Sequence, residues 1–223
     1  MSMGQEARQR DIIEIIRSYD EWKVRAYCRV RFHILRQRFL EEIGQYLPGS
    51  GSVLEFGCGF GLFSLYYARC YPRLSLLGVD INRRRIGMAR KAAERLQLGN
   101  VRYELGDATA YRFAGFHDAV YLLDLVHHIP DASVRPFLTR IHAHLSEGSV
   151  LIIKDVDVRP AYKRHFTHIL DRFVSFDGPV HYWPKDELIA ELDSIGFSVC
   201  HHSMPDYLPY PHMLYICRPR KKS

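Results

Sequence analysis

The sequence has no apolar run of about 18 residues, the length that a membrane-spanning helix needs. It also has no apolar leader near its first residue, and we therefore expect a cytoplasmic protein. The five cysteines are scattered, odd in number and never in C-x-x-C spacing. This usage is typical of free thiols in a reducing compartment and excludes a disulfide-rich scaffold.

Metal-binding motifs are missing as well. His165, His168 and His181 lie within a short stretch, but no carboxylate–histidine spacing of a known zinc type accompanies them. We therefore predict no metal site and interpret these histidines as exposed or packing residues.

The length of the chain and its hydrophobic content are sufficient for one domain with its own core. The chain has 223 residues, of which 47% are hydrophobic, and this predicts a single core with a decorated end. The net charge of +6 allows an acidic partner such as nucleic acid or an anionic lipid surface, without requiring one. No oligomeric state is predicted.

A glycine-rich turn organises the chain. An apolar, β-rich run over residues 52–56 is broken by three glycines at alternate positions, and a helix is expected directly afterwards at residues 62–69. Glycines permit a positive φ and let a ligand approach the backbone, while the helix N-terminus adds unpaired N–H groups. Glu55, before the turn, would repel a pyrophosphate but suits a ligand with a cationic amine and hydroxyls. The three glycines are Gly57, Gly59 and Gly61.

Acids follow the next two strands. A buried strand over residues 74–80 ends at Asp80, and Asn82 is expected to cap the helix that follows. An acid about twenty residues after a glycine turn can accept hydrogen bonds from both hydroxyls of a ribose. A third strand over residues 101–105 leads to Asp107. The start of the intervening helix is expected to be solvated at Arg83, Arg84 and Arg85.

Two histidines follow the fourth strand, which we expect over residues 118–124. An imidazole titrates near neutral pH and can take a proton from a hydroxyl. His128 is the leading candidate for a general base with His127 beside it; alternatively, His128 only hydrogen-bonds the loop backbone and holds the turn. A continuous apolar run over residues 149–155 predicts a central parallel strand ending at Asp155, an acid suited to orient the base.

The last third of the chain contains an insertion and a closing hairpin. Residues 160–183 do not fit a minimal βαβ unit, and we predict a substrate-selecting lid over about residues 157–183 with an aromatic, histidine-rich end. A helix is expected over residues 185–194. Two strands then follow, over residues 197–202 and 212–217, and because no crossover helix joins them they should pair antiparallel.

Residues 1–48 predict a helical cap on a main domain of residues 49–223. One long helix is expected to carry the apolar positions of residues 28–47, and a Pro-Gly pair stops it. Residues 22–40 contain six Lys or Arg and no acid. We favour a solvated helix face here. The alternative is a basic, aromatic cap that touches an anionic substrate or the inner surface of an anionic membrane.

Together these motifs resemble those of class I S-adenosylmethionine-dependent methyltransferases. Glu55 and the three glycines match every position of the family's first motif, E/D-x-G-x-G-x-G. The segment after the fourth strand resembles the L-x-H-x-P-D ending of many small-molecule methyltransferases, with Val126 replacing the usual Leu. The N-P-P-Y or D-P-P-Y set of base-modifying methyltransferases is missing, which disfavours a nucleic-acid substrate.

The resemblance implies an α/β fold, a Rossmann-like seven-stranded methyltransferase sheet with an antiparallel last strand and an N-terminal helical cap. It implies S-adenosyl-L-methionine as cofactor and S-adenosyl-L-homocysteine as product. For the acceptor, the aromatic, histidine-rich lid favours a small aromatic or lipid-like molecule that is methylated on oxygen or carbon. The implied cofactor contacts are Glu55, Phe56, Gly57, Cys58, Gly59, Gly61, Asp80, Ile81, Asp107, Ala108 and Leu123.

The resemblance also implies the chemistry-bearing residues, because the family's methyl-transfer chemistry lies in the loop after strand 4. The implied catalytic residues are His128, His127 and Asp155. N-terminal helices commonly cover the active site in this family, and the lid is rich in aromatic residues. Substrate contacts are therefore expected at Tyr27, His181 and Tyr182.

Two other classes of protein remain as alternatives. A nicotinamide-dependent oxidoreductase of the Rossmann type also uses a glycine turn and an acid after the second strand. Glu55 and the closing hairpin speak against it. A non-catalytic methyltransferase-fold module could dock on RNA or a membrane through residues 22–40, but the intact cofactor motifs speak against this alternative.

Overall fold

The computed structural model describes residues 3–156, 181–204 and 212–220. The chain forms two compact units, Met1–Ala108 and Thr109–Ser223. The boundary predicted after residue 48 separates the N-terminal helices from the rest of the chain and stays a prediction. Among the helices of the described ranges, none combines the length and the apolar character needed to cross a membrane.

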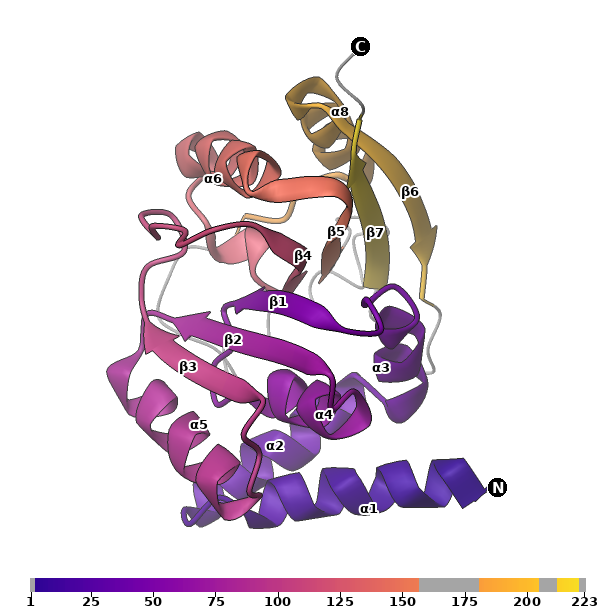
Figure 1. The fold of residues 1–223 in the computed structure, drawn as a ribbon. Coiled ribbons are helices and arrows are strands. Elements are labelled where there is room, and N and C mark those ends of the chain that lie inside the picture. Colours follow the sequence, from indigo (N-terminus) through magenta and orange to yellow (C-terminus); the bar gives the residue numbers. More distant parts are fainter. Residues whose placement is uncertain (1–2, 157–180, 205–211, 221–223) are drawn as a thin grey trace. The chain divides into compact units, whose positions relative to one another are not determined.

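The first unit is built on a parallel sheet in which β2 lies between β1 and β3 (Figure 1). Val53, Leu76 and Val101 stand side by side across the three strands and are all buried. Helix α1 packs on α2 and α4, and α5 packs on β2 and β3. The elements are α1 (Met3–Arg17), α2 (Trp22–Ile34), α3 (Gln37–Gly44), β1 (Gly51–Phe56), α4 (Leu62–Cys70), β2 (Leu74–Asp80), α5 (Arg83–Arg95) and β3 (Val101–Leu105).

The second unit has a mixed sheet centred on β5, which runs parallel to β4 and antiparallel to β7. Strand β6 pairs antiparallel with β7, as the predicted hairpin requires (Figure 1). Helix α6 packs on α8 and β5. The elements described are β4 (His117–Leu123), η1 (Val126–His128), α6 (Asp131–Ala143), β5 (Leu145–Val156), α8 (Lys185–Ile195), β6 (Phe197–Ser203) and β7 (His212–Pro219).

The predicted fold class is confirmed. The described residues supply the seven strands of a Rossmann-like mixed α/β sheet, and its closing strand β7 is antiparallel. Strands β4 and β5 are buried on both faces over most of their length, which explains their continuous apolar sequences.

The long helix predicted over residues 28–47 is two helices, and that prediction was wrong. The chain leaves the α conformation at Leu35 (ψ 81°) and Arg36 (ψ 160°), between α2 and α3. No glycine or proline marks this break. Because of the break, the adjacent residues Ile34 and Leu35 are both buried, and so are Phe39 and Leu40 in α3. One continuous helix would bury only a single face, and this segment buries more than that.

Gly61 offers a test of how tightly the turn after β1 is packed. Its φ is +80°, and a Cβ placed on it would lie 2.5 Å from the Tyr103 hydroxyl. We expect Gly61→Ala to lower the free energy of unfolding by about 2–4 kcal/mol in urea titrations, from backbone strain and overpacking combined. The matched control is Gly87→Ala in α5, where a Cβ meets nothing within 4 Å and stability should rise by up to about 1 kcal/mol. Equal stability of Gly61→Ala and wild type would contradict this packing.

Candidate active site

The glycine-rich turn between β1 and α4 has the left-handed backbone that its sequence predicts. The φ angle is +72° at Gly57, +55° at Gly59 and +80° at Gly61, values that other residues rarely adopt. The Gly57 amide donates to the carbonyl of Val79 in β2 at 2.8 Å, which ties the turn to the neighbouring strand. At the third glycine, the missing Cβ makes room for the side chain of Tyr103.

Asp80 at the end of β2 holds this turn in place. It is 7% exposed, and its two carboxylate oxygens accept the backbone N–H groups of Gly59 and Asn82, both at 2.8 Å. A carboxylate has about four lone-pair sites, so these two bonds leave capacity for hydroxyl donors. The Asn82 side chain caps α5, as predicted, by accepting the Arg85 amide at 3.1 Å. Asp80 therefore links β1, β2 and the start of α5.

The other predicted cofactor residues of the first unit differ in exposure. Glu55 and Phe56 at the end of β1 are buried. Ile81, directly after the acid of β2, is 72% exposed and presents an apolar side chain there. Asp107 is exposed and Ala108 is half-buried in the segment after β3. The ends of the strands beside the turn thus carry a buried acid, Glu55, and an exposed apolar residue, Ile81.

Cys58 lies between the first two glycines and is buried. Burial raises the pKa of its thiol well above the ordinary value, and the negative charges of Glu55 and Asp80 add to the shift. A Cβ on Gly78 in β2 would lie 3.0 Å from the Cβ of Cys58, so the two strands approach closely here. Cys58 is therefore a neutral packing group and not a nucleophile.

Aromatic side chains of the N-terminal segment cover Phe60 in the turn. The Tyr19 hydroxyl donates to the Phe60 carbonyl at 2.7 Å. The Tyr27 ring meets the Phe60 ring edge-on, with centroids 5.2 Å apart. The predicted substrate contact Tyr27 thus lies against the turn expected to hold the cofactor. Inside the first unit, the N-terminal helices and the glycine turn are packed together.

Arg85 corrects the expectation that the start of α5 is solvated. Arg83 and Arg84 are exposed, but Arg85 is half-buried. Its guanidinium lies 5.3 Å from the centre of the Phe60 ring, at cation–π distance. The local sequence does not show which of the three arginines faces the turn, because this depends on how α5 packs against Phe60.

In the second unit, Asp155 near the end of strand β5 pairs with His127. Both residues are buried, at 6% and 2% exposure. One carboxylate oxygen accepts the His127 backbone N–H at 3.2 Å, and the other contacts Nδ1 of the His127 ring. An acid on Nδ1 orients the imidazole and stabilises its charged form, as it does behind a general-base histidine.

His128, the leading sequence candidate for a base, has other surroundings. It is half-buried, and its ring centroid lies 4.1 Å from that of His127. The carboxylate of Asp155, expected to orient the base, is bonded to the ring one position earlier in the chain. The geometry therefore favours His127 over His128 for a charge-stabilised imidazole.

The predicted substrate residues of the lid end also lie next to His127. The His181 amide donates to the His127 carbonyl at 2.9 Å, and Nδ1 of the His181 ring lies 3.1 Å from a carboxylate oxygen of Asp131 at the surface. The Tyr182 ring centroid lies 5.3 Å from that of His127. Leu123, the predicted cofactor contact of this unit, is buried at the end of β4.

Lys154 was missed by sequence reasoning. It is 1% exposed and forms an ion pair with Asp124, which follows β4 and has a φ of +57°. The Asp124 amide also donates to the Lys154 carbonyl at 2.8 Å. The available signal was a lysine at the end of an otherwise apolar run, because such a residue must find an acid when it is buried.

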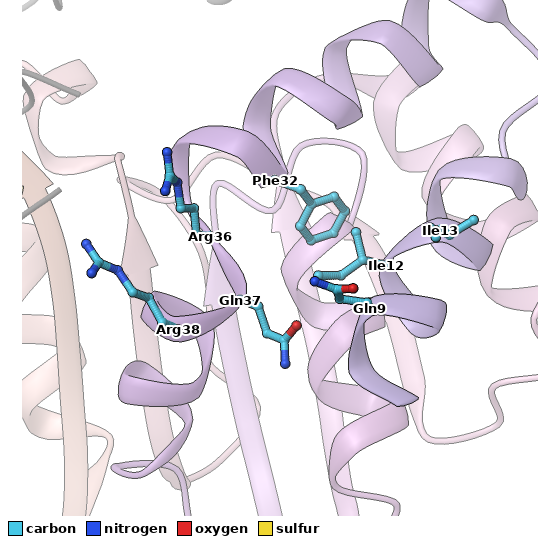
Figure 2. A pocket seen from close by; sticks show the side chains of 7 residues that line it. All are labelled: Gln9, Ile12, Ile13, Phe32, Arg36, Gln37 and Arg38. Carbon is cyan, nitrogen blue, oxygen red and sulfur yellow. The ribbon is translucent and has the colours of Figure 1, made fainter. Parts of the chain in front are cut away.

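A groove of about 440 Å³ lies elsewhere in the first unit, against α1 and the corner between α2 and α3 (Figure 2). Ile12 and Phe32 point toward one another at its centre, and the guanidinium groups of Arg36 and Arg38 lie to one side (Figure 2). Its lining residues are Gln9, Ile12, Ile13, Phe32, Arg36, Gln37 and Arg38.

Most of the predicted lid, about residues 157–183, lies outside the described residues, as do His165 and His168. Within the described ranges, no group of three or more His, Cys, Asp or Glu residues is placed to hold a metal ion.

Comparison with known proteins identifies the family. A family model described as "Methyltransferase domain" matches residues 24–202. The chain therefore belongs to this family, and its seven-stranded fold is that of the class I S-adenosylmethionine-dependent methyltransferases.

Individual proteins resemble parts of the chain. A probable (S)-tetrahydroprotoberberine N-methyltransferase 2 of Papaver bracteatum is 28% identical over 120 residues, 54% of this chain and 32% of the relative. An O-methyltransferase family protein of Burkholderia thailandensis has a TM-score of 0.70 at 19% identity, covering 91% of this chain and 62% of that one. A coclaurine N-methyltransferase bound to N-methylheliamine and S-adenosylhomocysteine has a TM-score of 0.59 at 17% identity, covering 74% and 49%. The matched part is thus about a third of the plant relative's length.

The first unit fits the cofactor that this family implies. The glycines of the turn have positive φ angles and carry no Cβ that would keep a ligand from the backbone. Asp80 retains lone pairs for ribose hydroxyls, and exposed Ile81 next to it suits the flat, apolar face of an adenine ring. Buried Glu55 suits a cationic amine. The ribose hydroxyls, the adenine ring and the amine of the cofactor thus each find a side chain of complementary chemistry in the first unit.

Proposed function

We propose that the chain is an enzyme that transfers a methyl group from S-adenosylmethionine to an oxygen or acidic carbon of a small aromatic or lipid-like acceptor. Membership of the methyltransferase family and the fit of the glycine turn support the cofactor. S-adenosylmethionine supplies, when bound, a methyl group carried on a positively charged sulfur. The residues proposed to hold it are Glu55, Phe56, Gly57, Cys58, Gly59, Gly61, Asp80, Ile81, Asp107, Ala108 and Leu123.

The observation that carries the choice of acceptor is the buried pair of His127 and Asp155. A base is useful only when the acceptor atom must lose a proton, as a hydroxyl or an acidic carbon does. A tertiary amine has no such proton. The carboxylate holds the His127 backbone and ring together, so the imidazole is oriented before substrate arrives. We assign His127 as the base, with His128 beside it and Asp155 as its positioning residue.

Substrate contacts are proposed at Tyr27, His181 and Tyr182. Aromatic rings suit an aromatic or lipid-like acceptor because they bury apolar area, and Tyr182 lies beside the proposed base. A nucleic-acid acceptor is disfavoured because the sequence lacks the motif that holds an exocyclic amino group.

Cofactor binding is tested at Asp80. Asp80→Ala should weaken S-adenosylhomocysteine binding by about 2–4 kcal/mol in calorimetry, because two charge-assisted hydrogen bonds to hydroxyls are lost. The same acid holds Gly59, so the unfolding free energy of the ligand-free variant must be measured alongside. Asp20→Ala is the matched control, since Asp20 is 66% exposed and pairs with Arg95 at the surface. If the folded Asp80→Ala variant binds S-adenosylhomocysteine with unchanged affinity, Asp80 does not bind the ribose hydroxyls.

The proposed base is tested by comparing the two histidines. His127→Ala and Asp155→Asn should lower kcat by roughly 10²–10⁴-fold with cofactor affinity retained, and His128→Ala should lower it less. His201→Ala, an exposed histidine on β6, should have wild-type turnover. If His127→Ala retains turnover and loses only thermal stability, His127 is a loop anchor and positioning alone supports the reaction.

We further propose that the enzyme works at the inner surface of an anionic membrane. The groove between α1, α2 and α3 favours this location, because its centre is apolar and its side carries Arg36 and Arg38. Exposed apolar residues on the same helices, Ile13 at 47% and Trp22 at 67%, suit insertion into the boundary of an anionic bilayer.

Vesicle pelleting tests this location. Binding to phosphatidylglycerol vesicles should exceed binding to phosphatidylcholine vesicles and fall steeply as salt rises. The double variant Arg36→Gln with Arg38→Gln should weaken binding at least roughly tenfold, at about 1 kcal/mol per lost charge. The control pair Arg83→Gln with Arg102→Gln removes the same charge from exposed sites in the same unit and should have little effect. If equal amounts of protein pellet with neutral and with acidic vesicles, the membrane location is wrong and residues 22–40 form only a solvated helix face.

A further inference from the structure

The surroundings of Arg85 set it apart from the two arginines before it. Arg83 and Arg84 are exposed, and Arg84 forms a surface ion pair with Glu21 at 2.5 Å. Arg85 is half-buried, and its backbone amide is fixed by the Asn82 cap. Three arginines in a row thus have two different environments.

The Arg85 guanidinium adjoins the glycine turn. It lies 5.3 Å from the centre of the Phe60 ring, and one terminal nitrogen is 3.8 Å from the place that a Cβ on Gly59 would occupy. Gly59 is also the residue whose amide donates to Asp80. The guanidinium and the carboxylate proposed to bind ribose therefore adjoin the same glycine.

The charge of Arg85 is partly withdrawn from water. Burial lowers the pKa of Arg85 and the nearby charge of Arg31 lowers it further, while Tyr27, Asp80 and Cys58 act in the opposite sense. A guanidinium nonetheless stays protonated in proteins. The guanidinium therefore places a positive charge next to Gly59, where it can attract an anionic group of a ligand.

We propose that Arg85 binds the α-carboxylate of the methionine part of S-adenosylmethionine and so positions the amino-acid end of the cofactor. This inference rests on the proposed function. The carboxylate is the only anionic group of the cofactor, whose sulfur and amine are positive and whose ribose carries hydroxyls. A guanidinium presents its N–H donors in a planar fork that matches a carboxylate. With Asp80 on the hydroxyls and Glu55 on the amine, each polar part of the cofactor then meets a group of complementary chemistry.

The test compares two ligands that differ in the carboxylate. S-adenosylhomocysteine contains it, whereas 5′-methylthioadenosine keeps the adenine, ribose and sulfur but lacks the amino-acid end. In calorimetry, Arg85→Gln should weaken S-adenosylhomocysteine roughly ten- to hundredfold and change 5′-methylthioadenosine by less than about twofold. Arg85→Lys should recover part of the loss because it keeps the charge. Arg83→Gln, which removes the same charge from an exposed site on the same helix turn, should alter neither affinity.

The outcomes separate this inference from the proposed function. An equal loss for both ligands, or no loss for either, would overturn the role of Arg85 while leaving cofactor binding intact. If wild-type protein binds neither ligand, the proposed function fails and this inference fails with it.

A measurement on wild-type protein covers the case in which Arg85→Gln does not fold. The carboxamide of S-adenosylhomocysteine, which has no charge at this position, should bind roughly ten- to hundredfold more weakly than the acid, and the difference should shrink at high salt. Equal affinities for acid and amide would overturn the proposal.

Discussion

The structure of each unit depends on a buried carboxylate near the end of one strand that holds the loop after the neighbouring parallel strand. In the first unit Asp80 accepts the amide of Gly59, and in the second unit Asp155 accepts the amide of His127. A buried carboxylate is costly unless donors surround it, so each acid requires its loop to be in place. The two loops on which cofactor binding and proton transfer are proposed are thus the ones that these acids fix.

One consequence is that the structural roles and the proposed functional roles fall on the same side chains. Asp80 links two strands and a helix before any ribose is present, and Asp155 orients His127 before any substrate is present. The buried pair of Lys154 and Asp124 adds a third link of this kind between β4 and β5. Pre-organised groups of this kind suit a reaction that depends on positioning.

The N-terminal helices are more than an outer cover. Tyr19 and Tyr27 contact Phe60 in the glycine turn, and Arg85 meets the same ring from α5. The turn is therefore supported by side chains from α2, from α5 and from the connection between α1 and α2. The same helices also line the groove that contains Ile12, Phe32, Arg36 and Arg38.

The sequence alone determined the order of elements, the glycine turn, the acid at the end of β2 and the antiparallel closing strand. These features follow from local rules, since positive φ selects glycine and buried strands are continuous apolar runs. Tertiary structure decided which imidazole Asp155 holds, which of three arginines faces the turn, and that the helix breaks at Leu35. Successive residues of a helix point about 100° apart, so neighbours of one residue type in sequence differ in direction. Only the packing of the rest of the chain determines which of them lies inside.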